Sequence, residues 1–273
     1  MNNRIHKKLD ELRSKNRKAL SIFITAGYPT IDATPDIVGI LEESGADIIE
    51  LGIPYSDPLA DGPTIQHSSD IALRNGVTLT TVFETVDRIR DKSNIPVVLM
   101  GYVNPLISYG IERFMETTSQ KGVDGLIIPD LPVEESDEYR SLAIQHNLAP
   151  VFLAAPTTSD TRLKQIDDIS EGFVYCVSIT GVTGQTNGLP ENVRDYLQRC
   201  KSNITRNPVL VGFGISSGDD ARKLAPYSDG IIIGSSLIKK INDAHDGNIF
   251  SDISIFIKEL REGLDNPPDL SEK

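Results

Sequence analysis

Two carboxylates, Glu50 and Asp61, are the side chains of this sequence with the clearest potential for chemistry. Glu50 lies in a short apolar run, 46–51, and Asp61 follows on a loop rich in Pro and Gly, 52–63. An acid at the carboxyl end of a strand, with a second acid on the loop above it, can place a proton donor and a proton acceptor over one substrate. The spacing alone equally fits a strand-end Glu that caps a neighbouring amide and an exposed loop Asp.

The alternation of side chains along a strand puts Glu50 on the face opposite Leu51. If that face points into a barrel, Glu50 is removed from water and its proton affinity rises.

Two glycine-containing loops near the end of the sequence have the composition of a phosphate site. Gly214 follows the apolar run 209–212, and Gly234-Ser235 follows the run 230–233. Glycine lets backbone N–H groups approach an anion, and the free amides at a helix start favour negative charge. We expect a short helix over 235–240 with Ser as its cap, although a lone Gly-Ser pair is often only a helix cap. A further segment rich in Gly, Thr and Asn, 178–189, is typical of a mobile lid or of disordered surface, and its position favours the lid.

Short apolar runs alternate with amphipathic segments along the whole chain, and the runs have the composition of parallel strands covered on both faces. The expected strands are 20–25, 47–51, 96–100, 125–128, 150–153, 173–178, 209–212 and 230–233. Helix start signals precede the segments that begin near Thr34, Glu134 and Thr158. The spacing of Ile5, Leu9 and Leu12 predicts a further helix that plugs the bottom of a barrel.

This order of elements predicts an α/β fold, a single-domain (β/α)8 TIM barrel over 1–264, with a disordered tail over 265–273. It includes an extra N-terminal helix and a short extra helix after strand eight. An open, flavodoxin-like doubly wound sheet is the alternative. The absence of a GxGxxG motif after the first strand, where 26–29 reads AGYP, weakens the dinucleotide-binding form of that alternative.

Composition excludes several classes of function. The formal net charge of −12 argues against a surface for nucleic acid or anionic membranes. The two cysteines, Cys176 and Cys200, predict no disulfide framework. No apolar run approaches a membrane span, so we expect a cytoplasmic protein. The four histidines are scattered, so no metal site is predicted.

Four motifs together resemble the tryptophan synthase α-subunit family. They are FITAGYP at 23–29, ELGIPYSDPLADGP at 50–63, GVTG at 181–184 and GFGI at 212–215. They follow in order along nearly the whole chain, and the second is highly specific to that family. The resemblance implies a lyase that cleaves indole-3-glycerol phosphate by retro-aldol chemistry to indole and glyceraldehyde 3-phosphate in L-tryptophan biosynthesis. It implies no cofactor in this chain and a partner β subunit that carries pyridoxal phosphate, in an α2β2 heterotetramer.

The resemblance also implies roles for individual residues, with Glu50 and Asp61 as the catalytic pair. The matching substrate-binding positions are Phe23, Tyr102, Tyr175, Thr183, Gly184, Gly214, Gly234 and Ser235. Pro54 and Asp57, on the loop that leads to Asp61, are expected at the partner interface. Some bacterial members carry an arginine in the lid where this chain has Ile179-Thr180, so closure here is expected to rest more on Thr183.

The implied reaction explains why two carboxyl groups are needed. The indole ring carbon must gain a proton, and the adjacent chain hydroxyl must then lose one. One group can serve both events, and Glu50 on a rigid strand is the better candidate, while Asp61 suits the positive charge that develops at the indole N–H. The alternatives are a stand-alone lyase that releases indole and a non-catalytic subunit that activates a partner. The presence of both carboxylates argues against the second alternative. A different phosphate-barrel enzyme explains the glycine loops but not the 50–63 motif.

Overall fold

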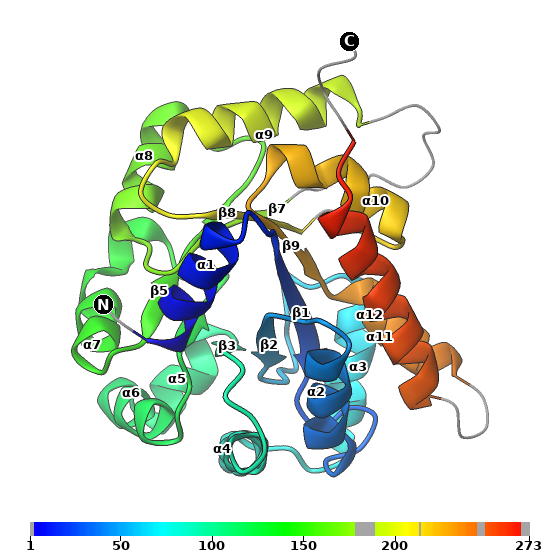
Figure 1. Cartoon of the computed structure of the whole chain (residues 1–273). Helices are drawn as coiled ribbons and strands as arrows, with labels where there is room; N and C mark the ends of the chain where they lie inside the picture. Colours follow the sequence, from blue (N-terminus) through cyan, green and yellow to red (C-terminus); the bar gives the residue numbers. More distant parts are fainter. Residues whose placement is uncertain (1–2, 178–188, 213, 245–248, 269–273) are drawn as a thin grey trace.

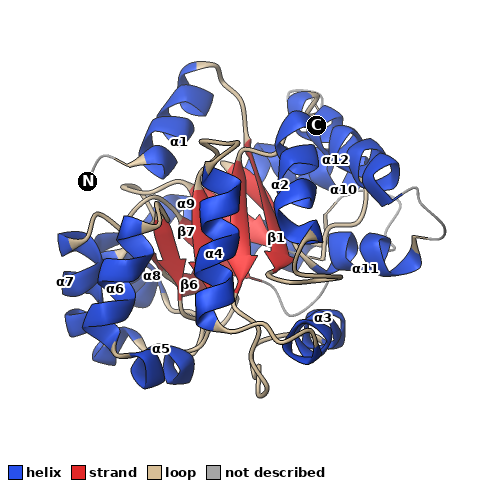
Figure 2. Cartoon of the chain, turned by 90° about the horizontal axis from the view of Figure 1, so that it is seen from below, coloured by secondary structure: helices blue, strands red, loops and turns tan. Residues whose placement is uncertain are grey.

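Parallel strands form a closed barrel at the centre of the protein, and helices surround it (Figure 2). The computed structural model describes residues 3–177, 189–212, 214–244 and 249–268. Nine strand segments pair in parallel in the order β5-β4-β3-β2-β1-β9-β8-β7-β6. They are β1 (Ala19–Thr25), β2 (Ile48–Gly52), β3 (Val97–Met100), β4 (Gly125–Ile127), β5 (Ala149–Val151), β6 (Leu153–Ala154), β7 (Val174–Val177), β8 (Val209–Gly212) and β9 (Gly230–Ile233).

The two segments at the ends of this order, β5 and β6, are halves of one barrel strand. They follow each other in the chain with only Phe152 between them. The break was not predicted, and it arises because β5 pairs with β4 whereas β6 pairs with β7. The sheet therefore closes on itself with eight strand positions, which confirms the predicted (β/α)8 barrel and rules out the open sheet.

Twelve α-helices and two short 3-10 helices are present among the described residues (Figure 1). The α-helices are α1 (Arg4–Ser14), α2 (Ala33–Glu43), α3 (Pro63–Arg74), α4 (Leu79–Arg90), α5 (Val103–Tyr109), α6 (Ile111–Gln120), α7 (Asp137–Gln145), α8 (Asp160–Ile169), α9 (Glu191–Asn203), α10 (Gly218–Leu224), α11 (Ser235–Asp243) and α12 (Ile249–Asp265). The 3-10 helices are η1 (Val133–Glu135) and η2 (Ala225–Tyr227).

The predicted N-terminal plug is present as α1, drawn in dark blue in Figure 1. Its buried residues Ile5, Leu9 and Leu12 pack in one apolar cluster with inward-facing strand residues such as Ile48 and Val98. The side chain of Asn3 caps the helix by accepting hydrogen bonds from the backbone N–H groups of Ile5 and His6. Because α1 closes the barrel at this end, substrate access is left to the opposite end, where the strands finish.

Two features of the C-terminal region differ from the sequence prediction: the cap of α11 and the residue at which α12 ends. The N-cap of α11 is Gly234 and no side chain caps the helix there, so the expected Ser cap is wrong. Asp265, predicted as the first residue of a tail, is the last residue of α12 and pairs with Arg17 at 3.0 Å and Arg261 at 2.8 Å. Residues 269–273 of the predicted tail lie outside the described residues. Within the described residues, no helix is long and apolar enough to cross a membrane.

Candidate active site

Glu50 lies on the inner face of the barrel, in the row shared by Phe23 of β1 and Val98 of β3. It is completely buried, and its Oε1 accepts a hydrogen bond of 2.7 Å from the Ser21 hydroxyl. Its Oε2 is buried without a partner among the described residues. Burial raises the pKa of Glu50 from 4.5 to about 7, against a smaller lowering by the Ser21 hydrogen bond. The carboxyl group can therefore hold or release a proton near neutral pH.

Asp61 lies on the loop between β2 and α3 and is held there by Tyr102. The Tyr102 hydroxyl accepts a 3.1 Å hydrogen bond from the N–H of Ala60 and donates one to the Asp61 carboxylate. Burial raises the pKa of Asp61 from 3.8 to about 6, and the bond from Tyr102 lowers it. Tyr102 is itself buried and packs against Tyr55 with 5.2 Å between ring centroids. The Asp61 carboxylate is therefore more basic than an exposed aspartate. Tyr102, which follows the end of β3, holds it in place.

Two aromatic side chains complete the inner surface around Glu50. Tyr175 of β7 lies across Gly212, where an added Cβ would stand 2.7 Å from the tyrosine hydroxyl oxygen. The ring of Phe23 lies against Gly52, where an added Cβ would approach to 2.6 Å. Burial raises the pKa of the Tyr175 hydroxyl, and the charges of Glu50 and Asp61 raise it further. The structure thus brings together Tyr175, Glu50 and Asp61, which are far apart in the sequence.

The two glycine loops predicted to bind phosphate lie beside each other. They follow β8 and β9, which pair as neighbours, and the Ser236 hydroxyl donates to the backbone oxygen of Ile215 to join them. Gly214 has a φ of +63°, a left-handed conformation that favours glycine. Gly234 caps α11 and Ser235 is its exposed first residue. Phosphate binding at these residues remains a prediction, and Thr183 and Gly184 lie outside the described residues together with the predicted lid as far as residue 188.

Replacing Gly234 with Val tests this site. A Cβ at Gly234 would meet its nearest neighbour, a Phe23 carbon, at 3.5 Å, which is an ordinary contact. We expect affinity for glycerol phosphate to fall about tenfold or more, since bulk at this position keeps an anion from the backbone amides. Melting temperature should change little. Calorimetry on this variant and on Gly39→Val, where an added Cβ meets nothing within 4 Å, provides the comparison. Equal affinity in both variants would place the phosphate elsewhere.

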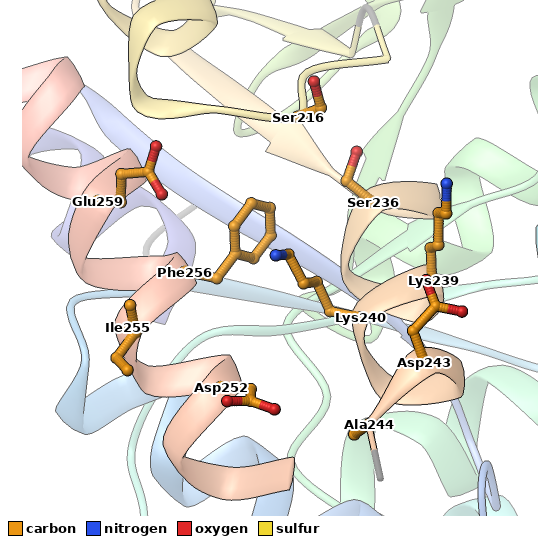
Figure 3. A pocket seen from close by; sticks show the side chains of 10 residues that line it. All are labelled: Ser216, Ser236, Lys239, Lys240, Asp243, Ala244, Asp252, Ile255, Phe256 and Glu259. Atoms are coloured by element: carbon orange, nitrogen blue, oxygen red, sulfur yellow. The ribbon is translucent and has the colours of Figure 1, made fainter. Parts of the chain in front are cut away.

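A separate cavity of about 610 Å³ lies between α11 and α12, and Ser216 and Ser236 line one side of it (Figure 3). Its lining includes the cations Lys239 and Lys240 and the anions Asp243, Asp252 and Glu259. The Lys240 amine lies over the ring of Phe256 at 5.6 Å from its centroid. Neither Glu50 nor Asp61 lines this cavity, and its mixed charge gives no preference for an anion, so the phosphate prediction stays with the two glycine loops.

The loop that carries Asp61 also presents an apolar surface. Asp57 is exposed and accepts a 2.7 Å hydrogen bond from Ser56, whereas Pro54 is buried within the chain. Of the two residues predicted at a partner interface, Asp57 is therefore the one able to touch a partner directly. Leu59 is 92% exposed on the same loop, and Ile107 of α5 is 57% exposed. Sequence reasoning missed Leu59, although a large apolar residue within a Pro- and Asp-rich loop was a visible signal.

Sequence reasoning also missed Ser21. Its signal was a polar residue two positions before Phe23, and thus on the same face, in an otherwise apolar strand. Nothing in the sequence indicated that this face would meet Glu50.

The chain is similar over nearly its whole length to proteins of one family. A family model described as "Tryptophan synthase alpha chain" matches residues 9–262. The tryptophan synthase alpha chain of Caldanaerobacter subterraneus subsp. tengcongensis is 48% identical over 263 residues, covering 96% of this chain and 100% of that protein. That of Christiangramia forsetii is 46% identical over 260 residues, covering 95% and 98%. The crystal structure of tryptophan synthase subunit alpha from Legionella pneumophila has a TM-score of 0.90 at 34% identity, covering 97% and 100%. The matched region contains both carboxylates and both glycine loops.

Proposed function

The chain belongs to the tryptophan synthase alpha chain family, and from that premise we propose that it cleaves indole-3-glycerol phosphate to indole and glyceraldehyde 3-phosphate. The observation that supports this most is the state of Glu50. A fully buried carboxyl group with a pKa of about 7 and an unpartnered oxygen suits a group that must act first as an acid and then as a base.

In the proposed reaction Glu50 donates its proton to the indole ring carbon that bears the glycerol chain. The ring then carries a positive charge shared with its N–H, and the Asp61 carboxylate stabilises that charge. The Glu50 carboxylate next takes the proton of the adjacent chain hydroxyl. The bond between ring and chain breaks, its electron pair restores the aromatic indole, and the chain leaves as an aldehyde. Glu50 ends protonated, so the cycle is closed.

We expect the residues around Glu50 and Asp61 to orient the substrate. We expect the phosphate to rest on the amides near Gly214, Gly234 and Ser235, and the rings of Phe23 and Tyr175 to border the indole and glycerol chain. On the basis of the resemblance alone, Gly184 is assigned to the phosphate site and Thr183 to the lid. The chain is expected to act in the cytoplasm.

A β subunit is the proposed partner, in an α2β2 assembly in which the pyridoxal phosphate belongs to that partner. The surface that supports this assignment is the loop with exposed Asp57 and Leu59, because it is continuous with the catalytic Asp61. A partner seated there would order Asp61 without adding a catalytic group.

An assay of indole and glyceraldehyde 3-phosphate release from indole-3-glycerol phosphate tests the proposal. We expect slow release by the chain alone and roughly ten- to a hundredfold faster release with a β subunit. The increase follows if the partner raises the fraction of molecules with Asp61 in its catalytic position from a few per cent to nearly all. Full speed without the partner would favour a stand-alone lyase. No release in either case, with stimulation of the β subunit, would indicate a non-catalytic activating subunit.

Replacing Asp57 with Ala tests the partner surface. We expect the stimulation by the β subunit to be reduced several-fold, because an exposed carboxylate beside Pro58 is lost as a partner for an interface cation. The slow activity of the chain alone should be unchanged. Asp91→Ala is the matched control, since Asp91 is an exposed carboxylate at the C-terminal end of α4, before β3 begins. Equal stimulation of wild type and Asp57→Ala would remove Asp57 from the coupling.

A further inference from the structure

Ser21 is the hydrogen-bond partner of Glu50 among the described residues. Its hydroxyl lies 2.7 Å from Oε1, and both side chains are completely buried. We propose that Ser21 is a positioning residue that binds Oε1 of Glu50 and thereby makes Oε2 the oxygen that exchanges the proton with the substrate. This inference rests on the proposed function, because it assigns the two oxygens of the same catalytic group.

The strand register explains how Ser21 acts on one oxygen only. Ser21 is paired with Ile48, and Glu50 is paired with Phe23, which is the next inward position along β1. Ser21 therefore lies one inward row below Glu50, toward the end of the barrel that α1 closes. Its hydrogen bond draws Oε1 toward that closed end. Within the part of the chain that the structure describes, Oε2 has no hydrogen-bond partner.

The chemistry of a neutral carboxyl group shows which of the two oxygens of Glu50 carries the proton. A protonated carboxyl has one carbonyl oxygen, which accepts hydrogen bonds, and one hydroxyl oxygen, which carries the proton. Because the Ser21 hydroxyl donates to Oε1, the proton resides on Oε2. After Oε2 has delivered its proton, the hydrogen bond remains and stabilises the carboxylate that must accept the next proton.

No other described group is positioned to replace the Ser21 hydroxyl. The inward neighbours of Glu50 in register, Phe23 and Val98, are apolar. The titratable groups in this part of the barrel are Tyr175 and Asp61, whose mutual influence appears in the raised pKa of Tyr175. Neither makes a hydrogen bond to Glu50, so loss of the serine hydroxyl leaves the carboxyl without a donor from the residues that the structure describes.

The pH dependence of Ser21→Ala distinguishes positioning from packing. Glu50 acts first as an acid, so kcat/KM falls as pH rises through its pKa. Ser21 stabilises the charged form, and its loss should move this alkaline limb upward by about half to one pH unit. We expect kcat to fall about tenfold with KM nearly unchanged. Ser21→Cys, which keeps the volume but donates weakly, should move the limb in the same direction. Ser228→Ala, a buried serine whose hydroxyl donates to the Leu224 backbone oxygen, should leave the limb in place.

A measurement without substrate separates this inference from the proposed function. Carbon-13 NMR of glutamate-labelled protein reports the titration of Glu50, identified as the signal absent from Glu50→Gln. The wild-type signal should titrate near 7, and the Ser21→Ala and Ser21→Cys signals higher. An unchanged titration in both variants would overturn the role of Ser21 even in an active lyase. A shifted titration in a protein that releases no indole would overturn the proposed function instead.

Discussion

Glu50→Gln is expected to lower kcat for indole release by at least about a hundredfold while leaving the barrel folded. Gln keeps the shape of the side chain and can still accept the Ser21 hydrogen bond, but it can neither donate the proton to the ring carbon nor take one from the hydroxyl. Steady-state assays with the β subunit present measure the loss. Near-full indole production by a folded variant would contradict the assignment of Glu50 as the group that donates and accepts the proton.

The same substitution should stabilise the protein above neutral pH. The pKa of Glu50 is raised on folding from 4.5 to about 7, so the folded state binds the proton more tightly than the unfolded state. This contribution to stability is complete below pH 4.5 and is lost as pH rises toward 7. At pH 8 the wild type therefore carries a penalty of roughly 3 kcal/mol that Gln avoids.

Thermal melts at two pH values check the stability effect. The melting temperature of Glu50→Gln should exceed that of the wild type by several degrees at pH 8 and by much less at pH 5. Glu42→Gln is the matched control because Glu42 is exposed on α2, and its melts should follow those of the wild type at both pH values. An equal gain in melting temperature at both pH values would show that the effect of Glu50→Gln does not come from the ionisation of Glu50.

Asp61→Asn is expected to lower kcat/KM about a hundredfold or more, because it removes the negative charge opposite the indole N–H in the transition state. Asp61 must be ionised, so activity of the wild type should rise with pH through its pKa of about 6. Glu50 must start protonated, so activity should fall through about 7. The activity of the wild type plotted against pH should therefore give a narrow bell-shaped curve. The curve of Asp61→Asn should keep only the fall at high pH that belongs to Glu50.

Tyr102→Phe provides the comparison for Asp61. It keeps the carboxylate but removes the hydroxyl that bonds Asp61 and the Ala60 N–H. Since that bond lowers the pKa of Asp61, its loss should move the acid limb to higher pH, with a smaller loss of activity than in Asp61→Asn. A bell that is identical in wild type and Asp61→Asn would show that the acid limb belongs to another group.

The barrel and the face on which each strand residue lies were predictable from local sequence patterns. Apolar runs alternating with amphipathic segments predicted the eight strand positions, and the stripe Ile5, Leu9 and Leu12 predicted the plug. These features are local, because side chains repeat with period two on a strand and near four on a helix. For the same reason the sequence predicted that Glu50 lies on the face opposite Leu51, and its burial was expected only if that face points into the barrel.

The tertiary structure alone decided which groups meet across the barrel. Ser21 and Glu50 are 29 residues apart, and Tyr102 and Ala60 are 42 apart. Periodicity gives the face of a residue but not the register of its strand against the next, which is fixed when the whole sheet closes. The raised pKa values of Glu50 and Asp61 follow from that closure, since burial by surrounding elements is the main cause of both. The carboxylates could therefore be identified from the sequence, but the hydrogen bonds by which Ser21 and Tyr102 position them could not.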